Sequence, residues 1–150
     1  MNGIDKLLWS IALPGFGQIL NGKYIKGILF IVLEFLINVQ ANFNEVIISS
    51  FQGDIEGAVM LTNYQWLMFY PCLYFFAAWD AYRDAGGGRS PYAFLPFVIA
   101  AYSTTIGLIY SSSYTINGIL IGPIWLPILG AFIGLGIGLL IRSGLIKLKA

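Results

Sequence analysis

The chain has 150 residues, of which 58% are hydrophobic and 10% are charged, and its net charge is +1. Soluble domains carry about 25% charged residues, so the composition excludes an ordinary water-soluble globule and predicts an integral membrane protein. A net charge this close to zero argues against a nucleic-acid partner, since phosphate binding needs clustered Lys and Arg. The sequence has no His, the commonest general base and metal ligand, and its single cysteine, Cys72, cannot form an internal disulfide.

The first apolar segment, Ile4 to Leu20, is interrupted by a turn of sequence PGFG. Pro removes a helix hydrogen bond and Gly loosens the backbone, so the part before the turn is too short to span a bilayer. The segment is either a kinked fifth spanning helix or an interfacial or re-entrant helix pair, and we favour the pair. It lacks a small-residue cleavage site, so we interpret it as retained and not as a signal peptide.

Four further segments are long and apolar enough to cross a bilayer, which takes roughly 20 residues. We therefore predict an all-α fold: a single integral membrane domain over residues 1–150, with four spanning helices and the N-terminal segment. The four predicted spans run from Ile25 to Ser50, from Leu61 to Tyr82, from Tyr92 to Tyr110 and from Gly118 to Ile141.

Lys and Arg occur only at every second connection of these crossings, whereas the intervening loop near Asp54 is acidic. This alternation follows the positive-inside rule. It predicts that the C-terminus and the basic connections face the cytoplasm, in what we expect to be a bacterial plasma membrane, and that the loop near Asp54 faces out. The basic residues concerned are Lys23, Lys26, Arg83, Arg89, Arg142, Lys147 and Lys149.

Glu34 lies well inside the first predicted span, about 12 Å beyond Lys26 at ~1.5 Å per residue. A charge facing lipid there costs at least ~2.5 kcal/mol, so Glu34 should face the bundle interior, be paired or be protonated. Together with Asn38, Asn42 and Glu45 it predicts a polar stripe along one helix face. The stripe either joins helices by hydrogen bonds, which we favour, or lines the cavity of a small channel or transporter.

The last predicted span carries Gly130, Gly134 and Gly138 at intervals of four residues. Small residues at this interval lie on one helix face, where two helix backbones can approach closely. The face packs either within the bundle, which we favour, or against a second copy or another membrane protein.

No group of residues has the spacing of a catalytic or ligand-binding site. The Ser residues have no His partner, and no two carboxylates are placed as an acid–base pair, so we expect no metal and no cofactor. We predict that the protein is not an enzyme and has a structural or accessory role, packing against itself or a membrane partner. The alternative is a small channel or transporter that uses the polar stripe around Glu34.

Two stretches also point to a family. The first contains Pro14, Gly15, Gly17, Gln18, Gly22, Lys23 and Gly27, and the second contains Asp80, Tyr82, Arg83 and Asp84. Over about residues 7–85 they resemble small bacterial membrane proteins related to the two-transmembrane-helix (TM-two) domain. The resemblance implies a helical hairpin whose Gly-rich turn and DAYR end lie on one membrane side, where Lys23 or Lys26 pairs with Asp80 or Asp84. The two helices within residues 92–141 are additions to that hairpin.

Overall fold

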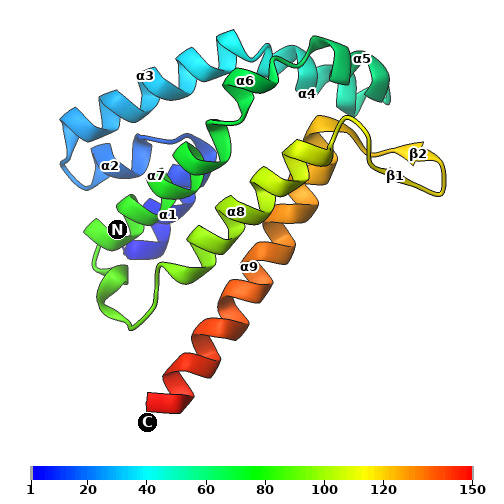
Figure 1. The fold of residues 1–150 in the computed structure, drawn as a ribbon. Helices are drawn as coiled ribbons and strands as arrows, with labels where there is room; N and C mark the ends of the chain where they lie inside the picture. The colour runs from blue at the N-terminus through cyan, green and yellow to red at the C-terminus, as the bar shows by residue number, and fades with distance from the viewer. Residues whose placement is uncertain (1, 150) are drawn as a thin grey trace.

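The structure, a computed structural model, describes residues 2–149, and helices form nearly all of its regular structure (Figure 1). Four longer helices follow one another in alternating directions: α3 (Tyr24–Gln40), α7 (Tyr70–Asp84), α8 (Leu95–Tyr110) and α9 (Gly122–Lys149). The predicted all-α class is confirmed, with one small addition, an antiparallel pair of strands before α9. The other elements are α1 (Gly3–Ala12), α2 (Phe16–Leu20), α4 (Phe43–Phe51), α5 (Ile55–Leu61), α6 (Tyr64–Leu67), the 3-10 turn η1 (Gly87–Arg89), β1 (Thr115–Ile116) and β2 (Ile119–Leu120).

One described helix is by itself long and apolar enough to cross a membrane, namely α9 over Gly122–Leu148. Helices α3 and α4 meet the same criterion only as a pair, and they are bent by 64° at the break between them. The apolar helix α8 has 16 residues, so it is about 24 Å long at ~1.5 Å per residue and shorter than the ~30 Å hydrocarbon layer.

The prediction of one continuous helix from Ile25 to Ser50 is wrong, because the chain bends at Asn42. Its φ is 55°, a left-handed conformation that a right-handed helix cannot continue through and that Asn tolerates better than most residues. The returning chain holds the bend: Asn42 Nδ2 donates a 2.9 Å hydrogen bond to the Leu61 carbonyl. The Asn63 N–H donates to the Ala41 carbonyl over 3.3 Å.

The second predicted span, Leu61 to Tyr82, is divided as well. Helix α5 ends at Leu61, and Thr62 has extended backbone with ψ 120°. The short α6 and then α7 follow, and Pro71 lies in the first turn of α7. Proline suits that place because the first-turn N–H groups have no partner within the helix.

The last two predicted spans exist as helices with shifted ends. Helix α8 begins at Leu95 and not at Tyr92, which has φ 55°. Helix α9 begins at Gly122, since Gly118 lies in the turn of the strand pair with φ 80°. At its other end α9 continues past Ile141 to Lys149, so the basic tail is helical.

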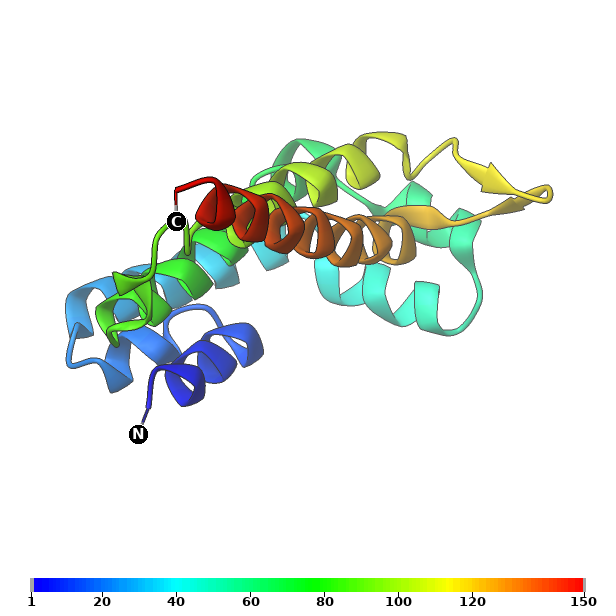
Figure 2. The same ribbon diagram turned by 90° about the horizontal axis from the view of Figure 1, so that it is seen from below.

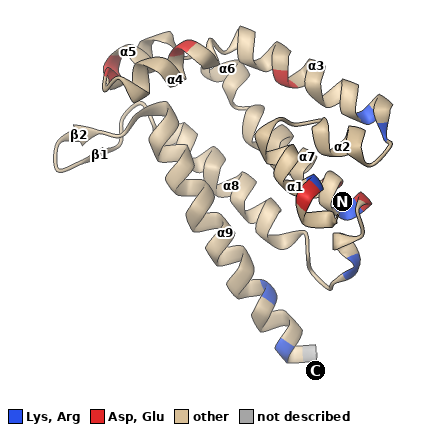
Figure 3. Cartoon of the chain, turned by 180° about the vertical axis from the view of Figure 1, so that it is seen from behind, with Lys and Arg blue, Asp and Glu red and all other residues tan. Residues whose placement is uncertain are grey.

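Charged residues gather at the two ends of the molecule (Figure 3). The described Lys and Arg residues lie at the end where α3 and α8 begin and where α7 and α9 finish. We call this the basic end. The opposite end, formed by α4 and α5, carries Glu45, Asp54 and Glu56 and no described Lys or Arg. Between the two ends, Glu34 of α3 is the one charged residue among the described parts of the four longer helices.

Candidate functional site

A group of polar side chains joins the N-terminal segment to α3 and α7 near the basic end. We call it the polar junction. Its members are Ser10, Gln18, Asn21, Lys26, Asp80, Arg83 and Asp84.

The Gly-rich turn makes the junction sterically possible. Gly15, between α1 and α2, has φ 108°, a region open mainly to glycine. A Cβ on Gly27 of α3 would lie 2.8 Å from the Gly15 carbonyl oxygen, so the two backbones nearly touch. A Cβ on Gly17 would lie 2.7 Å from the Ala81 Cβ. These glycines let the short α2 lie directly between α3 and α7.

Gln18 is completely buried and links three elements. Its Nε2 donates to the Ala77 carbonyl over 2.7 Å and to Asp80 Oδ2 over 3.2 Å. Its Oε1 accepts from the Ser10 hydroxyl over 3.3 Å. A buried amide is tolerated only when such partners replace water, and these partners hold α1 and α2 against α7.

Asp80 is the charged centre of the junction, with a side chain only 3% exposed. Lys26 Nζ lies 2.8 Å from Asp80 Oδ1, and an Arg83 guanidinium nitrogen lies 2.7 Å from the same oxygen. Both cations also contact Asp84, each over 3.1 Å. The predicted pairing is confirmed for Lys26. Lys23 is exposed and forms no ion pair with any described residue.

The two cations also decide the ionisation of Asp84. Burial by itself raises the pKa of this carboxyl, but the hydrogen bonds from Lys26 and Arg83 outweigh burial. The pKa of Asp84 is therefore held below its ordinary value. The carboxyl group of Asp84 is thus held between one cation from α3 and one from its own helix, α7.

The junction brings together the two stretches that suggested a family. Beyond the ion pairs, Asn21 Nδ2 donates a 2.8 Å hydrogen bond to the Ala81 carbonyl. Tyr82 packs near α8, its ring centroid 6.1 Å from that of Phe97. The Gly-rich turn and the DAYR end therefore lie at the same end of the molecule and in contact.

The predicted polar stripe does not lie on one helix face, because the 64° bend between α3 and α4 turns Glu45 away from Glu34 and Asn38. Glu34 Oε1 accepts a 3.2 Å hydrogen bond from the Tyr70 hydroxyl, and Asn38 Nδ2 donates to Asn44 Oδ1 over 3.1 Å. Glu45 lies in the first turn of α4. Tyr70 was not predicted as the partner of Glu34. Tyr usually lies at the ends of a membrane span, so the position of Tyr70 in the middle of a predicted span was the available signal.

The glycine face of α9 packs inside the chain, against α8. A Cβ on Gly130 would lie 2.5 Å from the Ser103 carbonyl oxygen, and one on Gly134 would lie 2.7 Å from Ala100 Cα. A Cβ on Gly138 would lie 2.5 Å from Pro96 Cα. Helix α8 therefore occupies this face, which is not open to a second copy.

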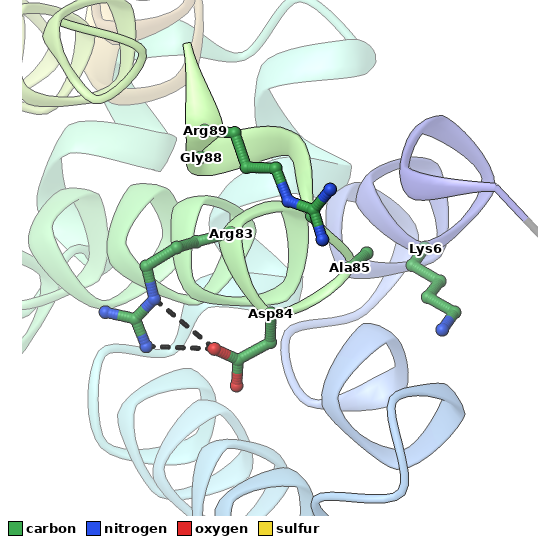
Figure 4. A pocket seen from close by; sticks show the side chains of 7 residues that line it. Lys6, Arg83, Asp84, Ala85, Gly88 and Arg89 are labelled. Atoms are coloured by element: carbon green, nitrogen blue, oxygen red, sulfur yellow. Dashed lines mark hydrogen bonds and ion pairs between the residues drawn. The ribbon is translucent and has the colours of Figure 1, made fainter. Parts of the chain in front are cut away.

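Two cavities lie beside α1, and neither was predicted from the sequence. The first is a basic pocket of about 490 Å³ at the basic end (Figure 4). The second is an apolar groove of about 750 Å³ between α1, α4, α7, α8 and α9. In Figure 2, α1 and α4 lie on the same side of α9, toward its two ends. The basic pocket is lined by Lys6, Arg83, Asp84, Ala85, Gly86, Gly88 and Arg89.

The ion pairs of the polar junction join α3 to α7. Each carboxylate, Asp80 and Asp84, contacts both Lys26 and Arg83. Over residues 2–149 no group of three or more His, Cys, Asp or Glu side chains is placed to hold a metal ion. No family model, curated protein or solved structure matches this chain.

Proposed function

We propose that the chain is a non-enzymatic integral membrane protein with four membrane segments, α3 with α4, α6 with α7, α8, and α9. The placement of Lys and Arg along these helices carries the proposal. The described Lys and Arg residues lie at one end, and the other end carries only acidic charged residues. A bilayer produces this distribution, because basic connections stay in the cytoplasm. The basic end is therefore cytoplasmic, together with the C-terminus, and the α4–α5 end faces out.

The apolar surface between the two ends supports the same proposal. Phe35 on α3 is 69% exposed, and Phe132 and Leu140 on α9 are 69% and 75% exposed. Soluble monomers rarely expose contiguous apolar patches larger than a few hundred Å², whereas lipid tails accept such side chains without cost. The short α8 can cross the bilayer if the hydrocarbon layer thins locally around it. This thinning costs fractions of a kcal/mol per Å of hydrophobic mismatch.

We propose that the N-terminal segment, α1 and α2, is an interfacial helix pair. Helix α1 has 10 residues, about 15 Å at ~1.5 Å per residue, which is half the hydrocarbon thickness. Its exposed residues include Ile4, Leu8 and Trp9, an apolar face that would dip into the headgroup boundary. The polar junction fixes this pair to α3 and α7 on the cytoplasmic side.

The role we propose is structural or accessory, through packing against a second copy or a membrane partner. The Glu34–Tyr70 hydrogen bond joins α3 to α7, which is the use expected of a helix-joining polar group, and it supports this role over a channel. The outer face of the last turns of α9 is the surface available for packing, since nothing lies within 4 Å of a Cβ placed on Gly144. We also propose a distant relationship to the TM-two-related proteins, supported by the contact between the two stretches that resemble them.

Cysteine crosslinking tests this role. In a Cys72→Ser background, Gly144→Cys on the outer face of α9 is expected to crosslink to a second copy or another membrane chain, because that face is open. Gln52→Cys, at the opposite end, is the control and should crosslink far less. The size of the protein in mild detergent should exceed that of one chain. A lone monomer, both in the membrane and after extraction, would contradict the accessory role.

A further inference from the structure

The basic pocket holds more positive than negative charge. Lys6, Arg83 and Arg89 line it together with one carboxylate, Asp84, an excess of two positive charges. Arg83 is already bound to Asp84 and Asp80. Lys6 and Arg89 form no ion pair with any residue in the described part of the chain. Figure 4 shows both of them on the side of Asp84 away from Arg83, with Lys6 coming from α1 and Arg89 from η1.

The apolar groove has the composition and depth of an acyl-chain site. Its walls include Leu7 and Ile11 of α1, and its α8 wall runs from Phe97 to Leu108. That wall is about 16 Å long at ~1.5 Å per residue. One leaflet of a ~30 Å hydrocarbon layer is about 15 Å deep. The α8 wall is therefore about as long as the chains of one lipid leaflet, and at the α4 end the groove continues to Phe43, Ile47 and Phe51.

The basic pocket and the groove are both lined from α1 and α7. On α1, Lys6 lines the pocket, and the next residue, Leu7, lines the groove. On α7, Ala78 lines the groove, and Arg83 and Asp84 line the pocket. Beyond η1, residues 90–94 lead from the pocket to α8, whose Phe97 lines the groove. A molecule with an anionic head and an apolar tail would meet positive charge at the cytoplasmic surface and apolar side chains below it.

We propose that the basic pocket and the apolar groove together bind one anionic phospholipid of the cytoplasmic leaflet. The phosphate lies between Lys6 and Arg89, and an acyl chain lies in the groove between α1 and α8. Arg83 keeps its ion pairs with Asp80 and Asp84. It therefore acts on the phosphate only through its positive electrostatic potential. This inference rests on the proposed membrane location, since the groove meets lipid only inside a bilayer.

The test is native mass spectrometry of the purified chain in detergent with added dioleoyl phosphatidylglycerol or dioleoyl phosphatidylcholine. We expect the anionic lipid to be retained at least about tenfold better, since two basic side chains, Lys6 and Arg89, attract its net negative headgroup. The double variant Lys6→Glu with Arg89→Glu should lose this preference. Ala131→Trp, which fills the groove, should reduce retention of both lipids. Lys147→Glu, a single charge reversal outside the pocket, should retain the preference.

Three outcomes would overturn the lipid site: equal retention of the two lipids, unchanged preference in the double variant, or displacement of the lipid by millimolar inorganic phosphate, which would show a site for the free anion only. Alkaline extraction of membranes separates this inference from the proposed function. A chain that stays in the membrane and shows no lipid preference contradicts the lipid site alone. A chain released by alkali contradicts the membrane location itself.

Discussion

Replacing Gly134 by Ala is expected to lower the free energy of unfolding by about 2 kcal/mol, in the range for overpacked sites. The added Cβ would lie 2.7 Å from both Ala100 Cα and the Ile99 carbonyl oxygen. Both atoms belong to the α8 backbone, which cannot rotate away as a side chain can. The two helices must therefore separate, and Gly134→Leu should separate them further. Thermal unfolding in detergent, followed by circular dichroism, measures the loss.

Gly136 provides the matched control for this prediction. It lies two residues further along α9, and nothing lies within 4 Å of a Cβ placed on it. Gly136→Ala should be neutral or slightly stabilising, since Ala is a better helix former by roughly 1 kcal/mol. Equal effects of Gly134→Ala and Gly136→Ala would contradict close packing of α9 on α8.

Replacing Asp80 by Asn is expected to destabilise the polar junction by about 3 kcal/mol, the lower end of the range for breaking a buried ion pair. The lower end applies because Lys26 and Arg83 are 44% and 45% exposed and can recover water. The change keeps the shape of the side chain but leaves both cations with Asp84 alone. Chemical unfolding in detergent micelles measures the effect, and N-terminal proteolysis should quicken as α1 and α2 detach.

The exposed Glu56→Gln at the acidic end is the control for charge removal and should change stability very little. A double-mutant cycle with Lys26→Met tests the pair directly. The loss from Asp80→Asn should shrink clearly when Lys26 is already absent, because the two side chains share one 2.8 Å contact. Fully additive effects would mean that this contact contributes nothing to stability.

Features encoded by local patterns were predictable from the sequence. Hydropathy predicted an all-α chain, and the alternation of Lys and Arg predicted that the basic residues gather at one end. The pairing of Lys26 with Asp80 and Asp84 followed from the resemblance to a hairpin, which places the Gly-rich turn beside the DAYR end. The interval of four residues predicted a closely packed glycine face, with packing inside the bundle favoured over packing against a second copy.

The breaks within the predicted spans were not predictable, because hydropathy carries no information on backbone dihedrals. The left-handed Asn42 is held by the Leu61 carbonyl, 19 residues away along the chain. The apolar groove is composed of residues as distant as Ile11, Phe97 and Leu135. No repeating pattern in the sequence identifies residues that are so far apart along the chain as lining one groove. The partner of Glu34, Tyr70, is likewise 36 residues away.

Three single-cysteine variants test the four-segment membrane arrangement most directly. In a Cys72→Ser background, Lys23→Cys, Glu56→Cys and Lys147→Cys are treated in intact cells with a maleimide that cannot cross membranes. We expect labelling of Glu56→Cys in intact cells, and labelling of Lys23→Cys and Lys147→Cys only after the membrane is opened. Labelling of position 23 and position 147 from opposite sides, or of all three positions in a membrane-free fraction, would contradict this arrangement.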